Sequence, residues 1–440
     1  MKSGNNVIYL ISTLLSLPDT VLQTAVSDLQ LSTFIAALYA SDLAKTTKRL
    51  PAITYFIPQN PAFTDLGLAM EWLLTADGKD DLRKVVKYHM VEGIVYSEDV
   101  EDGKRIHQTV EGGDVVIERT KPPHGHGPGI ITIGSPTKWP SHDSGSSLPS
   151  NGELSPANVT LPDSLTDTGV IHTIDQVVLP SDVDLTVGKL IKGSKQLTMS
   201  DLMIRAGLGW ILEGREPTKE EVQKAELEGR VRSWDEDEDE DGDGDGDEDG
   251  DGDEGKEGDF AYPAYIVLCP SDKAFSKLNL THYISTPSAL LSLLKLHIIP
   301  SSSLSSSSSL SSTMPPQNGQ PLALNDDSVY KTLLSTSSKY GDLAFRGTGD
   351  GDWIVGIKDA RGGERVRGDS ARVGMTGRAS VRWKNSRKSA SPNSDDDGEE
   401  EDRKHRDGRD RLWEGGMTLG GGVMMIDSVL IPYEPSWFSR

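Results

Sequence analysis

The chain has 440 residues, enough for two or three domains of ordinary size, and only 35% of them are hydrophobic. Its formal net charge is −23, but residues 235–254 hold 15 acids and no base, so the rest of the chain carries only −8. This balance provides no basic surface for a nucleic acid, and the single cysteine, Cys269, excludes an internal disulfide. No stretch has the roughly 20 apolar residues of a membrane-spanning helix.

Residues 1–19 are interpreted as a leader, signal segment or linker. Lys2 precedes an apolar run at 7–17, and a signal peptide likewise has a basic residue before its apolar segment. Pro18 and Asp19 then stand where small residues would mark a cleavage site. Three interpretations stay open: a signal peptide, a leader of the first domain, and a chain whose true start lies upstream.

Residues 20–182 are predicted to form one α+β domain. Helical spacing over 20–43 is followed by a β-rich run at 52–57, which stops at Pro58. Predicted buried residues on the helices are Phe34, Ile35, Leu38, Leu43, Leu82, Val85, Val86 and Met90. Strands are predicted at 114–119, 129–133 and 170–179. Early helices and later strands within one segment are typical of an α+β domain.

The same order returns over 183–440, which is predicted to be a second domain. A helical stretch at 200–212 precedes a β-run at 264–269 that also stops at a proline, Pro270; a helix at 289–296 and a strand at 423–431 follow. An internal duplication is the simplest explanation. Three low-complexity insertions, at about 235–259, 301–318 and 385–411, are predicted to be disordered.

Two signatures recur in order in both halves. Residues 54–63 read TYFIPQNPAF and residues 266–275 read IVLCPSDKAF; residues 169–180 read GVIHTIDQVVLP and residues 421–432 read GGVMMIDSVLIP. Asn60 and Asp272 are predicted to cap the helix that follows each proline turn. The signature residues expected to be structural are Pro58, Asn60, Phe63, His172, Asp175, Pro270, Asp272, Phe275, His297 and Asp427.

These signatures resemble those of the fasciclin (FAS1) family over nearly the whole chain. The resemblance implies two FAS1 domains, each a twisted β-sandwich or wedge flanked by helices. It also implies that the Tyr-His motif at Tyr88 and His89, and the Pro-Asp pair at Pro162 and Asp163, are candidate partner-binding residues. Ser164 stands where animal members carry isoleucine, so integrin binding is not inferred. The acidic and serine-rich insertions resemble those of fungal members.

The histidines and carboxylates in apolar runs allow two interpretations. His89, His172 and His297 either form a binding or pH-sensing site or are hydrogen-bonded core residues; Asp175 and Asp427 are interpreted as internal carboxylates. A hydrolytic triad from His89, Asp175 and a serine is the enzymatic alternative, but the sequence lacks a nucleophile elbow. No catalytic residue and no cofactor are predicted.

Metal and modification sites are also considered. His124 and His126 form an H-x-H pair in a glycine-rich loop, and the acidic tract contains an EF-hand-like spacing from Asp237 to Glu248. Neither is predicted to be a specific metal site, although the tract should bind divalent cations weakly. Asn158 and Asn279 lie in sequons and are candidate glycosylation sites.

The resemblance to the fasciclin family therefore implies a non-enzymatic adhesion protein of the secretory pathway, at the cell surface, in the matrix or in the vacuole. Its protein or cell-wall partner is unidentified. One alternative is a vacuolar or lumenal structural protein without an adhesive partner. The other is an acid-lumen hydrolase.

Overall fold

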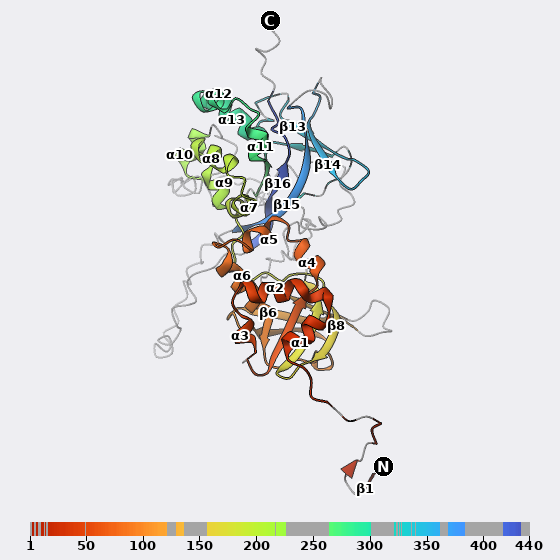
Figure 1. Ribbon diagram of the computed structural model, residues 1–440. Helices are drawn as coiled ribbons and strands as arrows, with labels where there is room; N and C mark the ends of the chain where they lie inside the picture. Colours follow the sequence, from red (N-terminus) through yellow and green to blue (C-terminus); the bar gives the residue numbers. More distant parts are fainter. Residues whose placement is uncertain are drawn as a thin grey trace, which may run out of the picture. The chain divides into compact units, whose positions relative to one another are not determined.

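Figure 1 shows the computed structural model of the chain. It describes residues 2–3, 6–7, 10–12, 14, 16–48, 50–120, 129–135, 156–215, 217–225, 264–300, 321–322, 324, 326, 328–335, 337–338, 340–360, 368–382 and 417–432. The three predicted insertions, the pair His124 and His126, and the EF-hand-like spacing lie outside the described residues.

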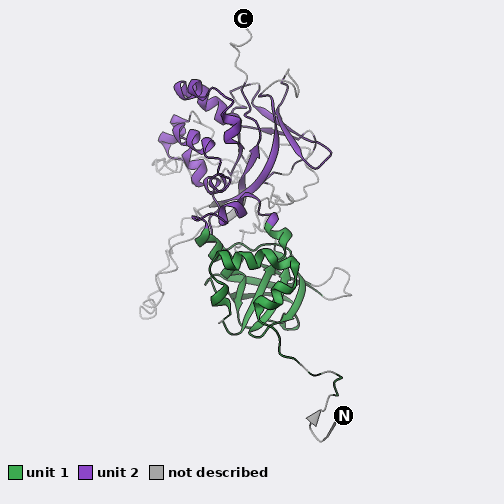
Figure 2. Ribbon diagram, viewed as in Figure 1, with its two compact units in different colours: residues 1–63, 79–136, 155–180 green, residues 64–78, 137–154, 181–440 purple. Residues whose placement is uncertain are grey.

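The chain divides into two compact units (Figure 2). Unit 1 comprises residues 1–63, 79–136 and 155–180, and unit 2 comprises residues 64–78, 137–154 and 181–440. Each unit contains one seven-stranded sheet with helices, so the predicted α+β class is confirmed. A two-residue pair, β1 (Lys2–Ser3) and β2 (Asn6–Val7), precedes unit 1's sheet.

The sheet of unit 1 has the strand order β4-β3-β9-β8-β7-β6-β5. Its strands are β3 (Ile53–Pro58), β4 (Met90–Glu92), β5 (Gly103–Gln108), β6 (Asp114–Thr120), β7 (Ile130–Gly134), β8 (Ala157–Leu165) and β9 (Gly169–Ile174). The pair β3–β9 is parallel, with Pro58 opposite Ile174. The N–H of Val110 donates to the carbonyl of Met90 across 2.8 Å, so the two edges approach and the sheet curls like a barrel.

Unit 2 repeats this topology, strand for strand, in the order β11-β10-β16-β15-β14-β13-β12. Its strands are β10 (Tyr265–Pro270), β11 (Ile298–Pro300), β12 (Ser328–Lys331), β13 (Asp342–Gly347), β14 (Trp353–Ile357), β15 (Ser370–Arg382) and β16 (Met417–Ile426). Again the proline-terminated strand is parallel to the closing strand, with Pro270 opposite Ile426. The predicted duplication of a unit joining these two strands is confirmed.

Helices in unit 1 pack the predicted apolar stripe into the core. They are α1 (Val21–Ser27), η1 (Leu29–Leu31), α2 (Ser32–Ala40), α3 (Ala44–Thr47), α6 (Lys79–Tyr88) and η2 (Ser97–Asp99), with α4 (Asn60–Thr64) at the boundary with unit 2. Phe34, Ile35, Leu38 and Leu43 are all buried. Leu82, Val85 and Val86 are buried on α6, but Met90 belongs to β4 rather than to the helix. The helix ends earlier than predicted because the chain turns into an edge strand after His89.

Helices in unit 2 are short and closely packed. They are α5 (Leu68–Leu73), α7 (Val187–Gly193), α8 (Thr198–Arg205), α9 (Gly209–Glu213), α10 (Lys219–Lys224), α11 (Asp272–Phe275), α12 (Leu280–Ser285) and α13 (Pro287–Leu296). The single helix predicted at 200–212 is two helices, because Gly207 adopts a φ of 81° that ends α8. The predicted strand 423–431 begins earlier, at Met417, and ends at Ile426.

The segment 64–78 completes the core of unit 2. Its helix α5 packs against α7 and β15, and Leu68, Ala69, Trp72 and Leu73 are buried. A Cβ on Gly193 would lie 2.6 Å from the backbone nitrogen of Trp72, so only glycine allows this approach. The ammonium groups of Lys189 and Lys192 lie 5.5 and 5.8 Å from the Trp72 ring centroid.

We expect Trp72→Ala to destabilise unit 2 by about 3–5 kcal/mol, because it leaves a cavity against α7. Hydrogen exchange measured by mass spectrometry should locate the lost protection in β15 and α7. Leu74→Ala is the matched control, since Leu74 directly follows α5 in the same segment and its side chain is exposed. Unchanged exchange in α7 of the Trp72 variant would contradict this packing.

Candidate partner-binding face

Tyr88 and His89 are core residues of unit 1. The Tyr88 hydroxyl donates to the carbonyl of Asp114 across 2.6 Å. His89 Nδ1 lies 2.7 Å from the carbonyl oxygen of Val85, and its Nε2 accepts the N–H of Val178 across 3.1 Å. Both side chains are buried, so in this conformation a partner cannot reach them.

Unit 2 repeats the histidine of this motif. His297 Nδ1 lies 2.8 Å from the carbonyl oxygen of Leu293, and Nε2 accepts the N–H of Leu430 across 3.2 Å. Leu296, which precedes it where unit 1 has tyrosine, is fully buried. In both units the ring therefore joins the end of a helix to the segment after the closing strand.

These contacts keep the two rings neutral. Burial lowers the pKa of His89 to about 4 and that of His297 to about 4. Both nitrogens of each ring bond to the backbone, which leaves no nitrogen for general-base chemistry. The Asp175 carboxylate meanwhile bonds to Asn158, so the triad considered from the sequence is not assembled in this conformation.

His172 holds a surface turn from inside unit 1. Its Nε2 lies 2.8 Å from the carbonyl oxygen of Val95, and its Nδ1 accepts the N–H of Asp163 across 3.3 Å. The ring stacks on Phe56 with centroids 5.1 Å apart, and burial lowers the His172 pKa. In unit 2 the corresponding residue opposite β10 is Met424, which is fully buried.

Pro162 and Asp163 form a fixed bulge in β8. The register of β8 against β9 shifts between Leu161 and Ser164, and Asp163 adopts a left-handed φ of 60°. The Asp163 carboxylate accepts the N–H of Ser97 across 2.8 Å and also its hydroxyl. Pro162 is exposed beside this locked residue. Of the four candidate partner-binding residues, the structure thus leaves Pro162 open and Asp163 half-buried.

An open depression of about 430 Å³ adjoins this bulge in unit 1. Three large apolar side chains on its lining are exposed: Ile94 at 43%, Tyr96 at 39% and Leu165 at 54%. The rest of its lining is Pro18, Pro51, Ala52, Thr166, Asp167, Thr168 and Gly169. This face was not predicted from the sequence. The feature of the sequence that indicates it is the apolar triplet Ile94–Tyr96, directly after Gly93.

The Ile-Asp carboxylates bind backbone at the surface and not in the interior. Asp175 Oδ1 accepts the N–H of Asn158 and Oδ2 accepts its side-chain amide, each across 2.7 Å. In unit 2, Asp427 Oδ1 accepts the N–H of Arg372 across 2.9 Å. Asp175 is half-buried and Asp427 is exposed, so their interpretation as internal carboxylates is wrong. Each one secures the neighbouring strand where the closing strand ends.

Asn60 and Asp272 do not cap the helices that follow them. Asn60 Oδ1 accepts the N–H of Thr33, in the first turn of α2, across 2.9 Å. Asp272 Oδ1 accepts the N–H of Thr198, at the start of α8, across 3.0 Å, while Ser271 caps α11. The side chains therefore satisfy a helix start that is distant in sequence. The remaining signature residues, Pro58, Phe63, Pro270 and Phe275, are buried.

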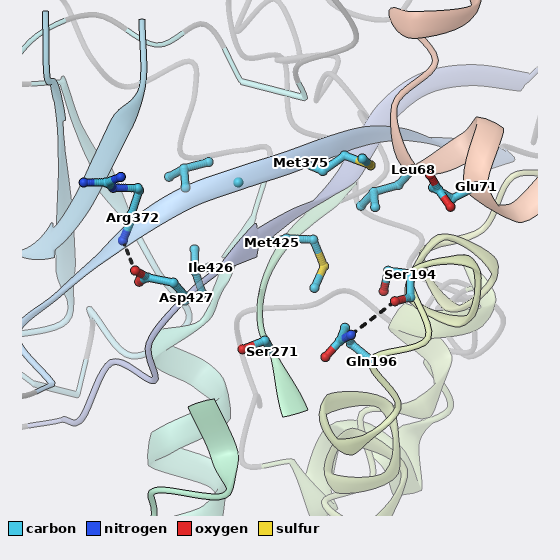
Figure 3. A pocket seen from close by; sticks show the side chains of 12 residues that line it. Leu68, Glu71, Ser194, Gln196, Ser271, Arg372, Met375, Met425, Ile426 and Asp427 are labelled. Atoms are coloured by element: carbon cyan, nitrogen blue, oxygen red, sulfur yellow. Dashed lines mark hydrogen bonds between the residues drawn. The ribbon is translucent and has the colours of Figure 1, made fainter. Parts of the chain in front are cut away.

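A second depression, of about 410 Å³, lies in unit 2 (Figure 3). Leu68 and Glu71 from α5 face Met375 and Met425 from β15 and β16 across it. At its base the side-chain amide of Gln196 donates to the carbonyl of Ser194 across 3.3 Å. The lining is mostly apolar and was not predicted from the sequence.

Within the described residues, no three His, Cys, Asp or Glu side chains gather as metal ligands. No single helix in that part of the chain is long and apolar enough to cross a membrane. Val21–Ser27 and Leu29–Ala40 reach the length and apolarity of a membrane span only when taken together, and a 111° bend separates them.

The two candidate glycosylation sites, Asn158 and Asn279, are both exposed. Asn279 precedes α12, whereas the Asn158 amide is bonded to Asp175.

The buried histidines make folding stability depend on pH. Their pKa of about 4 in the folded chain lies below the ordinary value of 6.5, so the unfolded chain binds more protons between these values. Stability should therefore fall as pH drops from 6.5 towards 4, by up to about 3 kcal/mol for each histidine. Urea denaturation followed by circular dichroism at several pH values measures this.

The exposed His282 provides the control. His89→Gln should weaken the pH dependence between 6.5 and 4, and His282→Gln should leave it unchanged. An equal slope in all three chains would show that other groups govern acid unfolding.

Comparison with known proteins identifies the family. The fasciclin domain model matches residues 29–180 and 259–339. Human periostin is 28% identical over 205 residues, 46% of this chain and 21% of periostin. A fasciclin-like arabinogalactan protein of the fungus Arthroderma benhamiae is 29% identical over 193 residues, 40% of this chain and 44% of that protein. The chain thus spans less than half the length of either relative.

Among solved structures, a FAS1 domain pair from the insect cell adhesion molecule fasciclin I matches 92% of this chain and 97% of its own, with 12% identity and a TM-score of 0.28. The family assignment rests on the domain model, which matches more than half of the residues. The chain belongs to the fasciclin domain family.

Proposed function

We propose that this chain is a non-enzymatic adhesion protein of the cell surface or extracellular matrix, and that unit 1 binds its partner through the depression beside Pro162. The observation that carries the proposal is the group of exposed apolar side chains, Ile94, Tyr96 and Leu165, beside a bulge fixed by Asp163. Apolar and aromatic side chains in a concave surface are typical of protein-binding sites.

The rigidity of this face supports a binding role. Asp163 is bonded to Ser97 through its carboxylate and to His172 through its N–H, so little conformational entropy is lost when a partner docks. Tyr88 and His89 then act as scaffold, because they fix the helix end and the segment after β9 from beneath. Two domains in one chain add avidity to weak individual contacts.

The histidines favour a neutral exterior over an acidic lumen. A vacuolar or lumenal structural protein is the alternative, but protonation of His89 and His297 would destabilise the fold as the pH falls towards 4. The occupied nitrogens of His89 likewise disfavour a hydrolase. The acidic and serine-rich insertions, with the match to a fungal arabinogalactan protein, support a cell-wall setting of the fungal kind.

A cell-attachment assay tests the adhesive face. Surfaces coated with the full chain should retain fungal cells or mammalian fibroblasts, and Tyr96→Asp or Leu165→Asp should reduce retention about tenfold, as expected for an anchor residue worth more than about 1.4 kcal/mol. Ile204→Asp is the matched control, an exposed apolar residue on α8 of unit 2. Retention no better than on albumin, or equal for all variants, would refute the proposal.

We also propose that the chain is a secreted glycoprotein with a glycan on Asn279, whose side chain is exposed ahead of α12. In a eukaryotic secretory host, Asn279→Gln should abolish the mobility shift caused by endoglycosidase treatment. Asn158→Gln should preserve the shift, because the Asn158 amide is engaged by Asp175. A shift that depends on Asn158 alone would reverse the assignment.

A further inference from the structure

Tyr96, the aromatic side chain of the proposed adhesive face, is held in place through the residues on either side of it. Val95 precedes it, and the Val95 carbonyl oxygen lies 2.8 Å from Nε2 of the buried His172 ring. Ser97 follows it, and the Ser97 N–H donates to the Asp163 carboxylate across 2.8 Å. The position of Tyr96 on the surface therefore depends on two side chains, His172 and Asp163.

These two residues also bind each other, and this contact fixes the protonation of the ring. The N–H of Asp163 can only donate, so Nδ1 of His172, 3.3 Å away, must accept and carries no proton. The carbonyl of Val95 can only accept, so Nε2 carries the proton and donates it. The neutral ring with its proton on Nε2 thus satisfies both backbone groups.

A second proton on this ring would disrupt the arrangement. It would place an N–H on Nδ1, directed at the N–H of Asp163, and two donors repel each other. The ring has little room to turn away, because it is buried and packs against Phe56 with centroids 5.1 Å apart. Both oxygens of the Asp163 carboxylate are bonded to Ser97, so a carboxylate that turned towards the ring would release Ser97. In either case a bond that fixes the loop around Tyr96 is lost.

The surroundings of the ring set the pH at which this happens. Burial lowers the pKa of His172 below its ordinary value of 6.5, while the bond to Val95 and the negative charge of Asp163 oppose this lowering. A ring released together with the loop regains an ordinary pKa. Acid therefore shifts the equilibrium towards the released loop, by up to about tenfold between pH 7.5 and 5.5.

The charged groups around this loop come from three elements. The groups are Asp163 on β8, Arg119 on β6, which donates to the carbonyl of Ser97, and the exposed Glu98 and Asp99 in η2. Strand β3 presents the uncharged Phe56 to the ring. Of these groups, the Asp163 carboxylate is the one whose charge acts on His172, and it favours the protonated ring.

Unit 2 indicates that the fold does not need a histidine at this place. Met424 occupies the equivalent position of the closing strand and is fully buried. His89, by contrast, is repeated in unit 2 as His297, with the same two kinds of backbone bond. The histidine of the shared architecture is thus duplicated, whereas His172 belongs to the unit that carries the candidate face.

We propose that His172 is a positioning residue of the adhesive face and that its protonation releases Tyr96, so that the chain detaches from its partner in mildly acidic surroundings. This inference rests on the proposed function, because it describes the regulation of that same face. The partner needs no titratable group of its own for this effect.

Hydrogen exchange measured by mass spectrometry tests the release without a partner. In the full chain, the protection of residues 94–98 should fall by up to about tenfold from pH 7.5 to 5.5, after correction for the intrinsic exchange rate. His172→Gln keeps an amide donor for the Val95 carbonyl but cannot be protonated, so its protection should not change. His172→Met copies unit 2 and should also lack the pH dependence. Circular dichroism verifies that each variant is folded at both pH values.

Cell retention at the same two pH values gives the functional result. Fibroblast retention on the unchanged chain should fall by up to about tenfold at pH 5.5, and retention on His172→Gln should stay the same. His282→Gln, a change at an exposed histidine of unit 2, should behave like the unchanged chain. All chains are compared at the same pH, so any effect of acid on the cells themselves cancels.

The outcomes separate this inference from the proposed function. Equal pH dependence in the unchanged chain and in His172→Gln, or protection of residues 94–98 that does not vary with pH, overturns the inference. Retention that requires Tyr96 but is insensitive to pH also overturns it and leaves the proposed function standing. Absence of retention at pH 7.5 refutes the proposed function, and hydrogen exchange then still decides whether His172 releases the loop.

Discussion

Parallel pairing between a proline-terminated strand and the closing Ile-Asp strand is the constraint on which each unit depends. In unit 1 it places residues that are more than 100 positions apart side by side, with Pro58 opposite Ile174. Strand β3 ends at Pro58, which donates no N–H, and the N–H of Gln59 still donates to the carbonyl of Ile174 across 3.0 Å before α4 begins. The Asp175 carboxylate then secures β8 by accepting two hydrogen bonds from Asn158. Sheet order, the bulge and the candidate face follow from this one junction.

In each unit, a buried histidine pairs two backbone polar groups next to the parallel strands. A helix ends against the sheet in each unit, and a backbone N–H after the closing strand enters the core. An imidazole satisfies both groups at once, since a neutral ring offers one donor and one acceptor. The fold thereby avoids unsatisfied buried backbone groups, at the cost of sensitivity to protonation. The same chemistry in both units marks it as part of the architecture.

Much of this architecture was predictable from the sequence, and the reasons for the failures are specific. Proline-stopped β-runs and amphipathic helices give strong local patterns, so β3, β10, α6 and α13 were recognised. Strand β5 is nearly all exposed, and the bulge in β8 breaks its alternation, so neither shows a period of two. The candidate face unites Tyr96 with Leu165, which only tertiary pairing brings together. The surface positions of Asp175 and Asp427 were hidden because their neighbours in sequence are apolar.

The discontinuity of unit 2 has a consequence for biosynthesis. Residues 64–78 are synthesised long before the glycines against which they pack. Gly377, for example, lies about 310 residues after Gly67 in the chain. At 5–20 residues per second, Leu68 would wait roughly 15 to 60 seconds for Gly377. A nascent chain with this apolar segment uncovered is a natural client for chaperones, and unit 2 completes its fold only after β15 and β16 have been synthesised.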